Sequence, residues 1–318
     1  MNDSIKNISV TEEESGKFSQ AYIVGVLIFQ QLSGALAFPI SKYGLAFIEP
    51  FTFAFFRFMI SSLVLFLLVQ LQKHKNKIEK SDYLKIIGLG AIIIPFNQTL
   101  YLWGQSMTAA GHGALLFATT PIWIFVAAMI HLKERPSIRR AIGIVVAIAG
   151  VFIIMTTGAV TIGTEYLWGD FIILIAVLAW AYYTILGKKL VQKYGAIRIT
   201  AYALVSGSAM YFPFGLYRAT GFDYSGIPVG AWLSVLYMAV GTSVITYVLW
   251  YWVLKYMEAS RIAVYHNMQP LIAAVVAFVW LDEPIGWAFV VGGLVCLLGV
   301  IVAETDFIHK DRVVPLAK

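Results

Sequence analysis

Charged residues are scarce in this 318-residue chain. Asp, Glu, Lys and Arg make up 13% of it, about half their share in an ordinary soluble domain. Hydrophobic residues make up 60%. A soluble protein with so few charges could not cover its own surface. The composition therefore excludes a soluble domain and predicts an integral membrane protein.

Several kinds of chemistry are also missing. The single cysteine, Cys296, lies in an apolar run, which excludes a disulfide framework and a cysteine-based metal site. There is no Walker motif, so ATP does not drive the protein directly. No Asp or Glu falls in the middle of an apolar segment, where proton-driven pumps usually place one. We expect no metal and no other cofactor.

Ten apolar segments are present. A hydrocarbon core of about 30 Å requires about 20 helical residues. The segments, numbered here as spans 1 to 10, are approximately residues 21–40, 50–72, 83–103, 113–132, 141–157, 168–187, 199–217, 229–254, 262–281 and 285–303. We predict an all-α integral membrane protein with ten transmembrane helices.

The basic residues predict an orientation. If there are ten spans, 20 of the 23 Lys and Arg residues lie on one side of the membrane, only Lys42 and Arg218 lie on the other, and Arg57 lies within span 2. Positive charge marks the cytoplasmic side. We therefore predict a multi-pass protein of the inner (plasma) membrane with cytoplasmic tails at residues 1–20 and 304–318.

The chain contains an internal repeat. A shift of 149 residues superposes Pro121 on Pro270, Glu134 on Glu283, Gly143 on Gly292 and Gly150 on Gly299. The predicted repeats are residues 21–157 and 168–303. Each has five spans, an odd number, so the two repeats insert in opposite directions. Inverted repeats are typical of alternating-access transporters; the alternative is a duplication kept only for stability.

These features resemble a known family. The residues that carry the likeness are Phe56-Arg57-Phe58, Thr120-Pro121 to Glu134, Trp180-Ala181-Tyr182-Tyr183 and Gln269-Pro270 to Glu283, with the spaced glycines of spans 5 and 10. They are similar to the drug/metabolite transporter superfamily, EamA-type branch. One departure is Ser33-Gly34 in span 1, where members often carry tryptophan. The resemblance implies a permease or exporter of amino acids, amines, sugars, nucleotides or drugs.

Polar and aromatic residues near the midplane are the candidate substrate-binding residues. Pro95, Pro121 and Pro270 each interrupt a helix close to one of them. The set is Gln30, Asn97, Tyr101, Thr120, Trp180, Tyr183, Tyr247, His266 and Gln269. We expect these side chains to face one central cavity, although ordinary helix packing could explain any one of them.

Two residues have alternative roles. Arg57 is either a counter-charge for a substrate carboxylate or a structural clamp on a neighbouring helix. His266 is either a carrier of a coupling proton or a polar wall of a wet vestibule. The spaced glycines of spans 5 and 10 could form a dimer face, but packing within the chain is the favoured use. The expected oligomeric state is a monomer or a homodimer.

The predicted function is secondary transport or export of small organic solutes. Expected partners are a small-molecule substrate and the lipid bilayer, not nucleic acid. A zwitterionic amino acid is the first substrate hypothesis and a hydrophobic amine the second. An enzymatic role is not expected; the alternatives are an intramembrane enzyme, which would need clustered carboxylates or histidines, and a lipid scramblase, which would show a polar stripe facing lipid.

Overall fold

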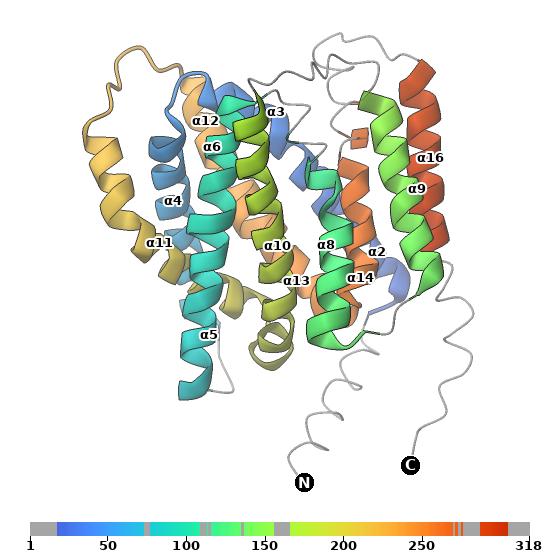
Figure 1. Ribbon diagram of the computed structural model, residues 1–318. Coiled ribbons are helices and arrows are strands. Elements are labelled where there is room, and N and C mark those ends of the chain that lie inside the picture. The colour runs from blue at the N-terminus through green and yellow to red at the C-terminus, as the bar shows by residue number, and fades with distance from the viewer. Residues whose placement is uncertain are drawn as a thin grey trace.

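The computed structural model describes residues 18–72, 77–108, 113, 116–134, 137–155, 166–269, 271–272, 275 and 287–304. All regular structure in these ranges is helical (Figure 1). The first half contains α2 (Gln20–Ala35), α3 (Ala37–Leu45), α4 (Pro50–Gln70), α5 (Lys80–Ala91), η1 (Ile92–Thr99), α6 (Leu100–Met107), α8 (Thr120–Ala127), η2 (Ala128–Leu132) and α9 (Ile138–Met155). The second half contains α10 (Leu167–Tyr194), α11 (Ala196–Thr220), α12 (Val229–Tyr237), η4 (Met238–Thr246), α13 (Tyr247–Tyr256), α14 (Ala259–Ala263), η5 (Val264–Asn267) and α16 (Trp287–Glu304).

The predicted all-helical membrane fold is confirmed. Six helical runs are long and apolar enough to cross a bilayer: Gln20–Leu45, Pro50–Gln70, Lys80–Met107, Leu167–Tyr194, Ala196–Thr220 and Val229–Tyr256. Leu116–Leu132 and Val290–Ala303 are shorter apolar helices, and α9 has 18 residues. Together they fall on predicted spans 1 to 8 and 10. Span 9 begins as α14 and η5 and continues outside the described residues, so the count of ten stays a prediction. Residues 282–285, between predicted spans 9 and 10, and most of both predicted tails also lie outside the described residues.

Spans 1, 3 and 8 are among those interrupted by local changes of helix geometry. Span 1 breaks at Leu36, between α2 and α3. Pro39 has no N–H to donate to the carbonyl four residues earlier, and its ring clashes with that carbonyl. Spans 3 and 8 contain the π-helical segments η1, which includes Pro95, and η4. By the 149-residue shift these two segments overlap. Each frees backbone groups near the middle of its span.

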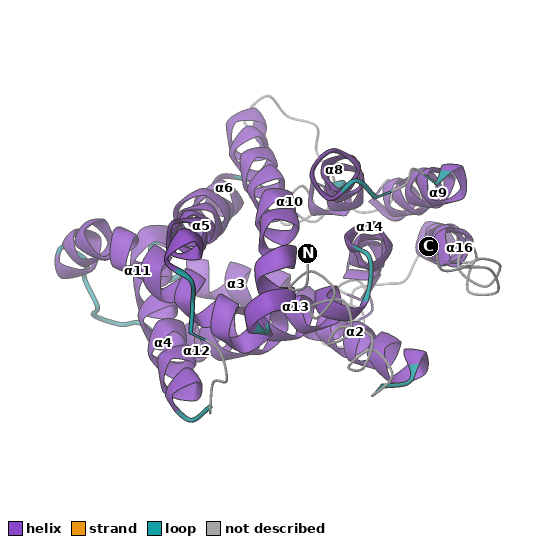
Figure 2. Cartoon of the chain, turned by 90° about the horizontal axis from the view of Figure 1, so that it is seen from below, coloured by secondary structure: helices purple, strands orange, loops and turns teal. Residues whose placement is uncertain are grey.

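The repeat-related helices α4 and α11, in spans 2 and 7, pack antiparallel, as inverted repeats require. Between α4 and α11, Tyr211 donates to the Phe51 carbonyl at 2.9 Å, and the Ser62 and Ser208 hydroxyls are 2.7 Å apart. The lower residue number on one helix therefore meets the higher number on the other. The helices α9 and α16 also lie side by side at one end of the bundle (Figures 1 and 2).

Glycine sets the close approach of α9 and α16. A Cβ at Gly143 would lie 2.6 Å from the Gly299 carbonyl oxygen, and a Cβ at Gly150 would meet the backbone of Gly292 and Cys296. No real Cβ tolerates such distances. The spaced glycines therefore serve packing between the two halves of one chain.

We expect Gly150→Val to force α9 and α16 apart and to lower the stability of the protein by about 1–3 kcal/mol, the usual range for overpacking. Gly88→Val is the matched control, because a Cβ at Gly88 on α5 meets nothing within 4 Å. Thermal unfolding in detergent measures both. Equal melting temperatures for the two variants would contradict the close packing of these helices.

Candidate functional site

A central cavity of about 80 Å³ lies between the two halves, large enough for several water molecules. Six of the nine predicted residues line it: Gln30, Tyr101, Trp180, Tyr247, His266 and Gln269. Arg57 lines it as well. The side chains come from α2, α4, α6, α10, α13 and the start of span 9, so both repeats contribute.

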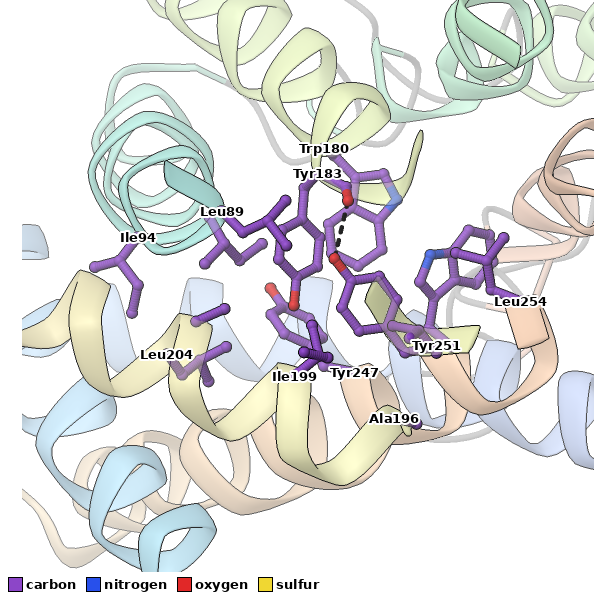
Figure 3. Packing of buried hydrophobic residues seen from close by; sticks show 14 of the residues in the cluster. Leu89, Ile94, Trp180, Tyr183, Ala196, Ile199, Leu204, Tyr247, Tyr251 and Leu254 are labelled. Carbon is purple, nitrogen blue, oxygen red and sulfur yellow. Dashed lines mark hydrogen bonds between the residues drawn. The ribbon is translucent and has the colours of Figure 1, made fainter. Parts of the chain in front are cut away.

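Asn97, Thr120 and Tyr183 do not line the cavity. The Asn97 amide donates to the Ala176 carbonyl at 2.6 Å and accepts from Gln98. Thr120 is fully buried in the helix packing. The Tyr183 ring stacks on Tyr251 at 4.7 Å, and the Tyr251 hydroxyl donates to the Tyr183 carbonyl at 2.9 Å (Figure 3). Asn97 and Tyr183 thus fix helices around the cavity.

Arg57 clamps span 2 to the π-helical segment of span 8. Its Nε donates to the Met238 carbonyl at 3.1 Å and to Ser243 Oγ at 3.0 Å, and Nη2 donates to Thr242 Oγ1 at 3.0 Å. The side chain is 1% exposed. The segment η4 presents a carbonyl and two hydroxyls together because its wider turn releases the backbone.

The Arg57 clamp leaves part of the guanidinium unsatisfied. Nη1 is buried and has no hydrogen bond of normal geometry. Within the part of the chain that the structure describes, no carboxylate forms an ion pair with Arg57. An unpaired charge inside a membrane is costly. The structural role and the counter-charge role proposed for Arg57 are therefore compatible in one side chain.

His266 is held by tryptophan. The Trp180 indole N–H, which can only donate, lies 3.1 Å from Nε2 of His266, so Nε2 is the unprotonated nitrogen. The Trp250 ring packs edge-on against the imidazole at 4.6 Å. Nδ1 then carries the proton and has no partner among the described atoms. A second proton would break the Trp180 bond, which disfavours His266 as a proton carrier.

Aromatic rings form two walls of the cavity. On one side the Trp180 and Tyr247 ring centres are 5.1 Å apart (Figure 3). On the other, Tyr101, Phe38 and Phe117 pack edge-to-face at 5.3–6.2 Å. Such rings hold apolar groups and attract cations to their faces.

Sequence reasoning missed several lining residues. They are Gly34, Ala37, Phe38, Gln98, Phe117, Met238, Thr242 and Thr246. Gly34 had a signal, since it is where the resemblance fails: a Cβ there would lie 2.8 Å from Gln269 Nε2. The absence of a side chain at Gly34 leaves room for the Gln269 amide. This amide donates a hydrogen bond to Gln31 Oε1 at 2.8 Å. The two phenylalanines carry no signal that separates them from packing residues.

A second polar cluster, centred on Glu134, lies at the face that carries most of the basic residues. The Glu134 carboxylate accepts from Lys188 Nζ at 3.1 Å, from the Ala259 backbone N–H at 3.1 Å and from the Ser260 hydroxyl at 2.5 Å. Arg140 also donates to Ser260. Glu134, at the end of span 4, thus caps the first turn of span 9. Through Lys188 it also connects the ends of these two spans to α10.

The Glu134 carboxylate is ionised. Burial raises the pKa of this carboxyl, but Lys188, Ser260 and the Ala259 N–H together outweigh burial and hold the pKa below its usual value. The side chains of Glu134 and Lys188 are 9% and 12% exposed, so the ion pair is shielded from solvent and salt.

A bundle of inverted helical halves around one polar, aromatic cavity is the architecture of a membrane transporter. The chain belongs to the EamA-like transporter family, whose profile matches residues 22–156 and 167–305, once in each half.

Similar proteins carry transporter names. An uncharacterized transporter of Bacillus subtilis, YyaM, is 30% identical over 292 residues, 91% of this chain and 94% of its own. A probable terminal-alkyne amino-acid exporter of Streptantibioticus cattleyicolor is 30% identical over 224 residues, 70% of this chain and 73% of its own. A crystal structure with TM-score 0.68 and 16% identity covers 86% of this chain and 98% of its own, and shows the shared fold.

We expect Glu134→Gln to destabilise the protein by about 1–3 kcal/mol at neutral pH, the range for hydrogen bonds to a charged group. Because the folded-state pKa of Glu134 is depressed below the ordinary value of 4.5, the stabilisation is present above pH 4.5 and is lost as the pH falls through the lower folded value. The gap in melting temperature between wild type and variant should therefore close in acid.

Glu79→Gln is the control for removing a carboxylate at the same face. Its side chain is 60% exposed and pairs with Lys193, so we expect a change below about 1 kcal/mol. A gap in melting temperature between wild type and Glu134→Gln that does not narrow as the pH falls well below 4.5 would show that Glu134 is not held as an ion.

Proposed function

We propose that the protein is a secondary transporter that exports a small zwitterionic solute, with an amino acid as the substrate class. The observation that carries this proposal is a set of three buried polar atoms that form no hydrogen bond of normal geometry, on side chains that line one cavity: Arg57 Nη1, His266 Nδ1 and Gln30 Oε1. Buried groups of this kind cost free energy until a ligand satisfies them.

The three atoms complement an amino acid. Arg57 Nη1 and His266 Nδ1 are donors and suit a carboxylate, and Gln30 Oε1 is an acceptor and suits an ammonium group. The Trp180 and Tyr247 rings favour an ammonium or an apolar side chain nearby. A hydrophobic amine without a carboxylate would leave the Arg57 guanidinium without a counter-charge, and its ammonium group would be repelled by that guanidinium. The amine therefore ranks second. The name of the Streptantibioticus cattleyicolor relative, a probable amino-acid exporter, agrees in class and direction.

The proposed cycle alternates access between inverted halves. The Glu134 cluster joins the end of span 4, α10 and the start of span 9 at one face, and we assign it to closing that face. In the proposed orientation this face is cytoplasmic, the protein lies in the plasma membrane and both termini are inside. We further propose exchange or facilitated diffusion, since His266 is held in one protonation state.

The substrate proposal is tested by counterflow in proteoliposomes loaded with neutral amino acids. We expect a free amino acid to compete at least about 10-fold better than its methyl ester, which lacks the carboxylate, or its N-acetyl derivative, which lacks the ammonium; one charged hydrogen bond is worth that much. An ester that competes as well as the free acid would contradict it.

A variant assigns the ammonium contact. Gln30→Leu removes the acceptor at similar volume, and we expect about a 10-fold loss of affinity for the amino acid but little change for its deaminated acid. Gln70→Leu is the control, because Gln70 is exposed at the end of α4. Equal losses for both ligands would remove Gln30 from the ammonium site.

Orientation is tested with single cysteines in a Cys296→Ala background. Ser225 and Gln72 are exposed in turns on opposite sides. We expect a membrane-impermeant maleimide to label Ser225→Cys in intact cells and Gln72→Cys only after permeabilisation. The reverse pattern would invert the proposed topology.

Coupling is tested with His266→Gln under an imposed pH gradient. We expect the ratio of gradient-driven flux to exchange to match that of wild type, because the Trp180 bond keeps Nε2 unprotonated. Loss of gradient-driven flux with exchange preserved would instead identify His266 as the proton carrier.

A further inference from the structure

A second hollow, here called the interfacial groove, has a volume of about 470 Å³. It lies where α2 and α13 meet the turn between α10 and α11. Tyr22, Arg198, Trp252 and Lys255 are among the residues that line it. None of these belongs to the central cavity, and transport as proposed above does not use them.

The groove opens to the outside of the bundle. On α13, Trp250 and Tyr251 are fully buried and face the other helices, whereas Val248, Leu249 and Trp252 line the groove and are only partly buried. The two sets occupy different faces of one helix. In a bilayer, the outer face of such a helix meets lipid, so lipid molecules have access to the groove.

The depth of the groove is that of the membrane boundary. The helix α2 begins at Gln20, α13 ends at Tyr256, and the chain turns between α10 and α11 at Gly195. These helix ends lie at the face that carries most Lys and Arg residues. Trp and Tyr are enriched at this depth, and here they form a cluster: Trp252 lies 4.8 Å from Tyr256 and 6.0 Å from Tyr22 between ring centres.

The charged side chains among the described residues of the groove are all basic. Arg198 and Lys255 both line it, and none of its described lining residues is acidic. Each cation also lies over a ring: the Arg198 guanidinium is 5.8 Å from the Tyr194 ring centre, and Lys255 Nζ is 5.6 Å from that of Tyr256. Basic pockets between helices at the cytoplasmic boundary bind anionic lipid headgroups.

We propose that the interfacial groove binds one anionic phospholipid, with the phosphate at Arg198 and Lys255 and an acyl chain against Val26, Val248 and Leu249. The proposed topology enters only in naming the leaflet, which is the cytoplasmic one. The bound lipid bridges the first span of one repeat and the last part of span 8 in the other, and so stabilises their contact.

The test is lipid binding to the full-length protein in detergent, read by native mass spectrometry and by melting temperature. We expect phosphatidylglycerol to remain bound at one molecule per chain and to raise the melting temperature more than phosphatidylcholine does. For Arg198→Gln/Lys255→Gln we expect about 30-fold weaker retention of phosphatidylglycerol, from the loss of two basic residues near a headgroup.

The matched control is Lys80→Gln/Lys189→Gln, which removes two exposed basic residues of the same face outside the groove. It should bind phosphatidylglycerol as wild type does. If the first variant fails to fold, Val248→Trp fills the apolar part of the groove and should remove the bound lipid with both charges in place. Equal retention by the first variant and its control, or equal effects of the two lipids on wild type, would overturn the proposal.

Inorganic phosphate separates a headgroup site from a free-anion site. We expect no rise in melting temperature with phosphate, because the acyl chain contributes most of the contact. A rise equal to that with phosphatidylglycerol would overturn the lipid assignment. None of these measurements uses transport activity, so they succeed or fail independently of the proposed amino-acid substrate.

Discussion

The contact between Arg57 and the π-helical segment of span 8 is the interaction on which the site depends. A bilayer offers no water to satisfy free backbone groups, so an interrupted helix must find partners inside the protein. The guanidinium supplies them by binding the Met238 carbonyl and the Thr242 and Ser243 hydroxyls. This contact fixes the start of α13 and hence Tyr247, which forms one wall of the cavity. It also places a positive charge beside the space it creates.

The two repeats solve this packing problem differently. The 149-residue shift pairs Arg57 with Ser206 on α11, whose hydroxyl bonds its own helix at Ala203. Near Ser206, Gly90 of span 3 and Gly207 of span 7 bring two backbones together: a Cβ at Gly90 would lie 2.7 Å from the Gly207 nitrogen. Of these two equivalent contacts between the repeats, span 2 with span 8 is therefore joined by a charged clamp and span 7 with span 3 by glycine contact. The asymmetry puts the guanidinium on one side of the cavity only, which suits a ligand with two different ends.

The sequence predicted the fold better than the site, for physical reasons. Continuous apolar runs report directly on the bilayer, and most of the expected spans appear at the expected residues. Asn97 stands out in the sequence as a polar residue beside Pro95, but its neighbour Gln98 lines the cavity. The segment η1 has more residues per turn than an α-helix, so the side chain that faces the cavity there is set by the fold. Tyr183 shares a helix face with Trp180, but its ring stacks on Tyr251 and does not line the cavity. The sequence gives no sign that the fold brings Tyr251 next to Tyr183.

The Glu134 cluster shows what alternating access requires of this molecule. Opening the face it closes would separate a carboxylate from Lys188 and from the first turn of span 9, at a cost of a few kcal/mol. A transporter must populate both states, so their free energies can differ by only a few kcal/mol. The opposite face must therefore gain contacts of similar strength when this one opens. Inverted repeats supply such contacts from equivalent elements, and in the proposed cycle the substrate adds only the difference by binding the atoms of Arg57, His266 and Gln30 that lack hydrogen bonds.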